Sequence, residues 1–254
     1  MMTTLTILGA GEAFDPNIPN TSLLYEGAKN VLLDCGFAAA QAYWRRGFDQ
    51  NYLDAIFLTH HHADHTFGLP AVLLVMQLAP QNRTKPLTII GTPNTKDYVT
   101  RMMDIAYTPG MKRLTFEVNF IECAPGDAVN LNPITINTAL PDHGIPVLST
   151  RWEVNDVCHF AYSGDGKATP ASHALFKDSN VLVHECYALP GHEGAVHTDV
   201  QTVLQLAADS KISTLILVHV AAAQRQLVAE FVRTQKFFGG RVLMPEAGLV
   251  LQVG

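Results

Sequence analysis

The sequence predicts an α/β fold of four layers, αββα, in which two β-sheets pack face to face and helices cover both outer faces. Strand-like segments outnumber helical ones, and helical segments occur in both halves of the 254-residue chain. Hydrophobic residues make up 48% and charged residues 16%, which supplies ample apolar surface for a core. Because no linker rich in Ser, Gly or Pro interrupts the chain, we expect residues 1–254 to form one domain.

The first half of the chain combines short apolar or alternating runs with longer helical segments. The second and third of the expected strands form a hairpin. The expected strands of this half lie at 3–9, 22–27, 29–36, 54–60, 86–91 and 115–123. Helices are expected at 37–46, 67–79 and 94–106, and Pro70 is tolerated in the first turn of the second one.

The segment YTPGMKRL, residues 107–114, breaks this regularity. One interpretation is a lid that carries Lys112 and Arg113 towards an anionic substrate. The preferred interpretation is a loop with a solvated basic pair and with core methionines at Met102, Met103 and Met111.

The second half starts with strands and then alternates helices with strands. Its expected strands lie at 133–140, 149–154, 157–165, 181–187 and 213–220. Its expected helices lie at 170–178, 198–210 and 223–236. The segments RVLMP and AGLVLQV at the end are expected to form a last hairpin.

Charge and cysteine content narrow the classes of function. The formal net charge is -6 and the sequence pI is near 6.0, so no general positive field for nucleic acid is implied. The cysteines form no CxxC pair, and free thiols in a reducing compartment are expected at Cys35, Cys123, Cys158 and Cys186. The first residues lack the features of a signal peptide, and no apolar run approaches about 18 residues. We therefore expect a cytoplasmic protein.

The glycine-rich segment GAGEAF, residues 9–14, follows a strand and suggests a dinucleotide-binding loop. Phe14 replaces the third glycine, and DPNIPN follows where a helix should start. Because the pyrophosphate would need that helix N-terminus, a tight turn is the preferred interpretation.

The segment THHHADH, residues 59–65, directly follows a buried strand. In an extended segment alternate side chains share a side, so His60 and His62 face one cavity while His61 points away. Asp64 and His65 lie at the start of the next helix, where they face a second point nearby. Imidazole and carboxylate ligands suit zinc, and also manganese or iron, whereas a polar loop that happens to be rich in His is the alternative.

One cluster cannot complete two metal sites, so other segments must supply further ligands. Ionisable residues that follow strands are the candidates, because ligand sites of layered α/β folds gather at strand ends. They are His143, Asp165 and His219.

The sequence resembles the metallo-β-lactamase superfamily, and within it the ribonuclease Z-like phosphodiesterases, over nearly the whole chain. The resemblance lies in THHHADH, His143, SGD (163–165), HE (184–185), HT (197–198) and LVH (217–219), in the order of that family. It implies an αββα sandwich with two mixed β-sheets. It also implies two divalent metal ions, zinc above all and otherwise manganese or iron. His60, His62 and His143 would bind the first ion, Asp64, His65 and His219 the second, and Asp165 would bridge them.

The resemblance implies a hydrolytic mechanism. Two divalent ions about 3.5–4 Å apart can share a water molecule, lower its pKa and offset the charge that grows on a phosphodiester. His197 would donate a proton to the leaving group, Glu185 would orient it, and Asp64 would serve both as ligand and as part of the catalytic set. The alternative for His197 is a surface position next to a helix start. His184 and His192 have no assigned role, and His61, His159 and His173 are interpreted as structural or exposed.

Two departures from ribonuclease Z bear on the substrate. Only 22 positions separate His143 from Asp165, which leaves no room for the long arm that holds tRNA in that family. The segment FDPNIPNTS, residues 14–22, lacks the basic residues found there. A small or cyclic phosphodiester, or an RNA 3′ end, is therefore expected, and processing of tRNA is doubtful.

Other functions are compatible with the same set of residues. The same metal pair could hydrolyse a lactone, thioester or sulfate ester, and a non-catalytic metal-binding domain is a third hypothesis. A di-iron site that reduces oxygen is a lesser one, since such sites carry Glu where this chain has His62. A homodimer is common in the branch, although nothing in the sequence shows one.

Overall fold

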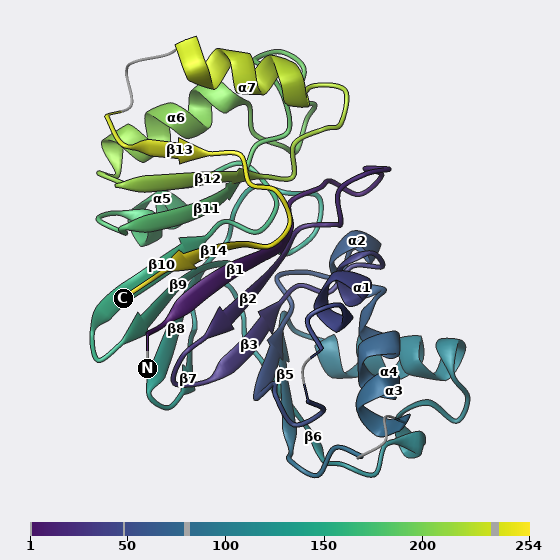
Figure 1. Ribbon diagram of the computed structural model, residues 1–254. Helices are drawn as coiled ribbons and strands as arrows, with labels where there is room; N and C mark the ends of the chain where they lie inside the picture. Colours follow the sequence, from purple (N-terminus) through teal and green to yellow (C-terminus); the bar gives the residue numbers. More distant parts are fainter. Residues whose placement is uncertain (1, 48, 79–81, 235–238) are drawn as a thin grey trace.

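Two seven-stranded β-sheets face each other, and helices lie against the outer face of each (Figure 1). This arrangement is seen in a computed structural model that describes residues 2–47, 49–78, 82–234 and 239–254. The largest apolar cluster lies between the sheets and includes Tyr25, Phe57, Trp152 and Phe160. The predicted four-layer α/β class is confirmed.

The first sheet has the strand order β14-β1-β2-β3-β4-β5-β6. Its strands are β1 (Thr4–Gly9), β2 (Ser22–Glu26), β3 (Asn30–Leu33), β4 (Ala55–Phe57), β5 (Leu87–Gly91), β6 (Val118–Glu122) and β14 (Leu249–Gln252). Neighbours from β14 to β3 are antiparallel, and neighbours from β3 to β6 are parallel. A short turn joins β2 to β3, whereas crossovers that contain helices connect the parallel strands.

The second sheet repeats this pattern with the order β13-β12-β11-β10-β9-β8-β7. Its strands are β7 (Ala128–Leu131), β8 (Ile134–Ala139), β9 (Ser149–Val154), β10 (Val157–Tyr162), β11 (Val181–Glu185), β12 (Thr214–Val218) and β13 (Arg241–Leu243). Strands β7 to β10 are antiparallel, and β10 to β13 are parallel. The sequence did not reveal β7, because Val129 is its only buried residue.

The predicted hairpin at the end of the chain is wrong. Strand β13 pairs in parallel with β12, whereas β14 pairs antiparallel with β1 in the other sheet. The chain thus crosses between the sheets after β13. Each strand completes the edge of a different sheet, and Leu249 and Leu251 pack against the core between them. A local turn signal carries no information about these distant partners.

The helices divide between the two outer faces (Figure 1). In the described part of the chain, the α-helices beside the first sheet are α1 (Ala39–Trp44), α2 (Ala63–Thr66), α3 (Leu69–Leu78) and α4 (Thr95–Ala106). Those beside the second are α5 (Pro170–Phe176), α6 (Val200–Asp209) and α7 (Arg225–Thr234). Among the described residues, no helix has both the length and the apolar character needed to cross a bilayer.

The segment that follows α4 agrees with the preferred interpretation. It forms a 3-10 turn, Gly110–Arg113, in which Lys112 and Arg113 are exposed. Met103 is fully buried, and Met102 and Met111 pack against the cluster between the first sheet and its helices. The four cysteines are unpaired, as expected.

Candidate metal centre and active site

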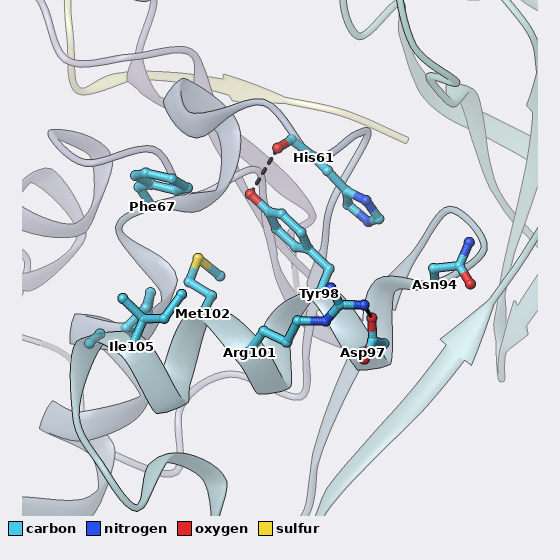
Figure 2. Close-up of a pocket in the computed structure, with 10 residues that line it drawn as sticks. His61, Phe67, Asn94, Asp97, Tyr98, Arg101, Met102 and Ile105 are labelled. Carbon is cyan, nitrogen blue, oxygen red and sulfur yellow. Dashed lines mark hydrogen bonds and ion pairs between the residues drawn. The ribbon is translucent and has the colours of Figure 1, made fainter.

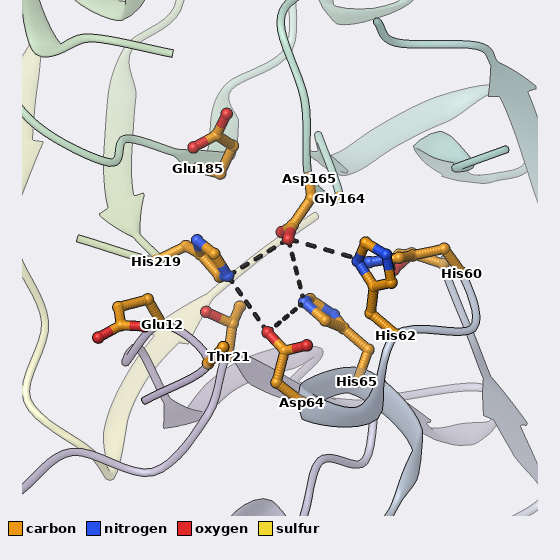
Figure 3. A network of polar contacts seen from close by, with 12 residues as sticks. Glu12, Thr21, His60, His62, Asp64, His65, Gly164, Asp165, Glu185 and His219 are labelled. Carbon is orange, nitrogen blue, oxygen red and sulfur yellow. Dashed lines mark hydrogen bonds and ion pairs between the residues drawn. The ribbon is translucent and has the colours of Figure 1, made fainter. Parts of the chain in front are cut away.

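The predicted ligand residues converge where strands of both sheets end (Figure 3). His60 lies three residues beyond β4, Asp165 three residues beyond β10, and His219 directly after β12. His143 follows β8. Because the two sheets face each other, loops that leave the same end of each sheet meet over the core.

The first group joins His60, His62 and His143, whose ligand nitrogens all lie within 4.8 Å of one another. Nε2 of His143 is 3.4 Å from Nδ1 of His62. His62 has an extended backbone, with φ -66° and ψ 152°, and the chain enters α2 directly after it. This extended stretch places His60 and His62 in one group and leaves His61 outside it.

The second group joins Asp64, His65, Asp165 and His219, whose ligand atoms also lie within 4.8 Å of one another. Oδ2 of Asp165 is 3.2 Å from Nε2 of His219 and 3.3 Å from Nε2 of His65. The same oxygen is 3.9 Å from Nε2 of His60 in the first group. Asp165 therefore lies between the two groups (Figure 3).

The spacing and burial of these atoms fit metal binding. Zinc bonds of about 2.0–2.2 Å in a tetrahedron separate neighbouring ligand atoms by about 3.4 Å. The carboxylate of Asp64 is 3.4 Å from Nε2 of both His65 and His219, which matches this separation. Nε2 of His60, Nε2 of His65 and Oδ1 of Asp165 are buried with no hydrogen-bond partner among the described residues. Since buried polar atoms are normally satisfied, these three fit a bound cation.

Electrostatics support the same conclusion. Burial alone would raise the pKa of Asp165, but His219 and His65 beside it hold that pKa well below its usual range. Burial, with a contribution from His65, holds the pKa of His60 well below its usual range, so His60 is a neutral imidazole that can ligate. Burial opposes protonation of His65, yet Asp165 and Asp34 outweigh it and raise its pKa.

The sequence did not indicate a role for Asp34, which follows β3. Its side chain is buried beneath the ligands and acts as a hydrogen-bond acceptor. Its carboxylate accepts hydrogen bonds from the ring of His65 at 2.8 Å and from the hydroxyl of Tyr162 at 3.0 Å. It also accepts bonds from the backbone and hydroxyl of Thr59. Such a partner directs Nε2 of His65 towards the site and fixes its tautomer. A signal was present, because Asp34 ends an apolar strand as the ligand candidates do.

The backbone at the site adopts uncommon conformations. His219 and Asp34 have φ values of 58° and 56°, a region that few residues other than glycine enter. Gly164 has φ 61°, and a Cβ there would lie 2.7 Å from Val147, so the sharp turn before Asp165 requires glycine.

A second polar pair adjoins the ligand groups. Nδ1 of His197 is 3.7 Å from Oε2 of Glu185, an ion-pair distance that exceeds a hydrogen bond. The other oxygen of Glu185 accepts a hydrogen bond from the backbone of Thr198 at 2.8 Å. The ring of His197 stacks on Tyr187 at 4.8 Å and lies 5.2 Å from the ring of His219. Tyr187 thus supports His197 from one side, a contact that the sequence did not indicate.

The remaining histidines lie outside the ligand groups. His159 is buried and its Nδ1 is 2.9 Å from the hydroxyl of Tyr25. Nδ1 of His184 is 2.7 Å from the backbone oxygen of Glu185, and His192 is exposed.

A family model described as Anti-Pycsar protein Apyc1 matches residues 3–238, and this range includes every residue of both ligand groups. The chain belongs to the Apyc1 family.

Curated relatives of this Apyc1-family chain are ribonucleases Z. The enzyme of Methanosarcina mazei is 23% identical over 306 aligned positions, which cover 99% of this chain and 98% of the relative. That of Thermoplasma volcanium is 24% identical and covers 74% and 76% of the two chains. The alignment with the Methanosarcina mazei enzyme is longer than the 254-residue chain, so that enzyme contains segments that this chain lacks.

Solved structures share the fold. The metallo-β-lactamase fold protein YhfI from Bacillus subtilis has a TM-score of 0.82 and 18% identity, with 98% of both chains covered. Human tRNase Z, short form (ELAC1), has a TM-score of 0.80 and 21% identity, with 99% of both covered. Together with the ribonuclease Z relatives, this fold confirms the expected membership of the ribonuclease Z-like metallo-β-lactamase superfamily.

Proposed function

We propose that this Apyc1-family chain is a dinuclear metal-dependent phosphodiesterase that hydrolyses a small or cyclic phosphodiester. The observation that carries the proposal is the convergence of seven ligand side chains from both sheets, with Glu185 and His197 beside them. The ribonuclease Z relatives support phosphodiester chemistry.

The two ligand groups would hold two divalent ions, zinc above all, with Asp165 contributing to both. His60, His62 and His143 would hold one ion, and Asp64, His65 and His219 the other. When bound, such ions activate water and neutralise charge on phosphoryl oxygens. The protein contributes the positions of its ligands, which Asp34 and the buried surroundings keep in place.

His197 would donate the proton that the leaving oxygen needs. Glu185 lies on the Nδ1 side of its ring, so Nε2 is the nitrogen left to face the substrate. Contact with a carboxylate holds the orientation of the ring. The stack on Tyr187 limits rotation of the ring. Hydrogen bonds of this kind are often long before the substrate binds.

A small substrate is proposed because the chain has neither an arm for tRNA nor a positive net charge. Only the β9–β10 hairpin and its flanking loops lie between His143 and Asp165, so no arm for tRNA exists there. The net charge of -6 does not attract a polyanion. A cyclic nucleotide or cyclic phosphate, held by the metal ions rather than by basic side chains, is therefore the proposed class.

The test measures metal content and hydrolysis of bis-p-nitrophenyl phosphate and of a cyclic nucleotide. We expect the wild type to hold about two ions per chain and to cleave both substrates. His197→Ala should lower kcat on the cyclic nucleotide by about 10²–10³-fold, because its alkoxide leaving group needs a proton. Nitrophenolate is a much weaker base, so the loss on that substrate should be smaller.

His173→Ala, on α5, serves as the control and should retain both activities. Equal losses on the two substrates would contradict the role of His197 as proton donor. Turnover of lactones or sulfate esters without phosphodiester cleavage would instead favour the alternative hydrolase.

We also propose a homodimer in the cytoplasm. Phe67 and Ile105 are 56% and 86% exposed, and with Met102 they line an apolar cavity of about 650 Å³ (Figure 2). A second copy presenting the same surface would cover it. Light scattering should show a dimer, and Ile105→Asp should shift the protein to monomer; a monomeric wild type would contradict the proposal.

The proposed cytoplasmic location rests on the unpaired cysteines, which suit a reducing compartment.

A further inference from the structure

The middle histidine of the THHHADH motif is held on the side away from the ligand groups. Nε2 of His61 is 2.8 Å from the hydroxyl of Thr95 and 3.2 Å from that of Thr92. The Thr95 hydroxyl donates to the backbone oxygen of Thr92, so it accepts the Nε2–H of His61.

Tyr98, on α4, contacts this histidine in two ways. The two rings are stacked, with centroids 4.3 Å apart and planes within 5°. The hydroxyl of Tyr98 donates to the backbone oxygen of His61 at 2.8 Å (Figure 2). One side chain thus holds both the ring and the backbone of His61.

The hydroxyl of Tyr98 also contacts Thr66, the residue that directly follows the motif. It lies 2.8 Å from the hydroxyl of Thr66, which is itself 2.8 Å from the backbone oxygen of His62. Two hydroxyl protons are therefore shared among three short contacts. Tyr98 and Thr66 together hold two successive carbonyl groups in the segment that carries the first ligands.

These contacts matter because residues 60–62 belong to neither a strand nor a helix. They take no part in a strand ladder; the backbone oxygen of His62 accepts from the N–H of His65 at 3.1 Å, and side chains supply further contacts to this segment. In extended backbone, holding His61 on one side turns its two neighbours to the other. The contacts of Tyr98 therefore act on the orientation of His60 and His62.

We propose that Tyr98 is a positioning residue that, through His61, holds His60 and His62 in the arrangement needed to bind metal. The inference rests on the proposed function, because it requires that these two histidines bind an ion. It assigns a role to a residue of α4 that contacts no ligand group itself. It also gives His61 a purpose within the motif other than ligation.

The test compares zinc affinity of the full chain by competition with a chelator. Tyr98→Phe keeps the ring stack and removes the hydroxyl, so we expect the ion that His60, His62 and His143 would hold to bind about tenfold less tightly. Tyr98→Leu removes both contacts and should weaken binding further. Excess zinc should restore the kcat of Tyr98→Phe, which a general loss of structure would not allow.

Tyr107→Phe is the matched control, because Tyr107 lies at the end of the same helix and is 37% exposed. Its affinity should equal that of the wild type. If Tyr98→Phe also binds zinc as tightly as the wild type, the positioning role is wrong, whether or not Tyr98→Leu folds. A wild type that binds no zinc would instead overturn the proposed function, and this inference with it.

Discussion

Asp34 shows that the site extends beyond the residues that would touch an ion. Its carboxylate is fully buried, and a buried charge is costly unless donors surround it. The ring of His65 and the hydroxyl of Tyr162 provide such donors. Burial and the nearby Asp34 raise the pKa of Tyr162, so its hydroxyl keeps the proton that it donates. A single residue thereby joins β3, β10 and the His motif.

Replacing Asp34 with Asn tests this role at the residue scale. The amide group places two donors where acceptors are needed and removes the charge that orients His65. We expect Asp34→Asn to weaken zinc affinity by about 10–100-fold and to lower the Tm of the metal-free protein. Asp97→Asn, on the exposed face of α4, should change neither. An unchanged zinc affinity in Asp34→Asn would show that His65 is oriented by other contacts.

At the scale of elements, the position of α2 depends on two close backbone contacts. A Cβ on Gly36, in the turn after β3, would lie 1.9 Å from the backbone oxygen of Asp64. A Cβ on Gly68 would lie 2.2 Å from the backbone oxygen of Gly36. Backbone N–H of Cys35 also donates to the oxygen of His65 at 2.7 Å. The helix that carries Asp64 and His65 can therefore sit against β3 only while both glycines are present.

Gly36→Ala should push α2 away from the sheet. Because the clash is with backbone, we expect a loss of more than about 2 kcal/mol in unfolding free energy and a lower metal content. Gly239→Ala is the control, since nothing lies within 4 Å of its added Cβ. Chemical denaturation and metal quantification provide the measurements. A Gly36→Ala protein with wild-type stability and metal content would contradict this account of α2.

At the scale of the whole molecule, the site draws on both sheets. On the side of the first sheet, His60 comes from the loop after β4 and Asp64 from α2, whereas Asp165 and His219 come from loops of the second sheet. Asp64 and His219 are 155 residues apart, and their ligand atoms are 3.4 Å apart. Bound metal ions would therefore join the two sheets, and their removal should affect the stability of the entire chain.

The pH dependence of stability tests this link. Neighbouring carboxylates outweigh burial and raise the pKa of His65 and His219 in the folded chain. The stabilisation from these protons is complete below the unfolded pKa of about 6.5 and is lost as pH rises through the raised values. The metal-free protein should therefore lose Tm as pH increases above about 7, whereas the metal-loaded protein should not, because metal replaces the protons. Parallel Tm profiles for the two forms would contradict the assignment of His65 and His219.

Much of the fold was predictable because local pattern reflects local structure. Alternation and apolar runs located most strands, and the helices around Pro70 and after Asp199 lie close to their predicted ranges. The errors have two causes. Strand β7 is short and mostly exposed, and the partners of β13 and β14 lie far away in sequence.

The sequence by itself determined the fold class, the family resemblance and the set of candidate metal ligands, because each of these depends on the types and spacing of residues along the chain. Only the tertiary structure decided which of them meet, and it revealed Asp34, Tyr98 and Tyr187 around them. Asp34 and Tyr162 are 128 positions apart, and no periodicity in the chain relates them. Such contacts arise from the packing of the two sheets, which brings distant strand ends to one place.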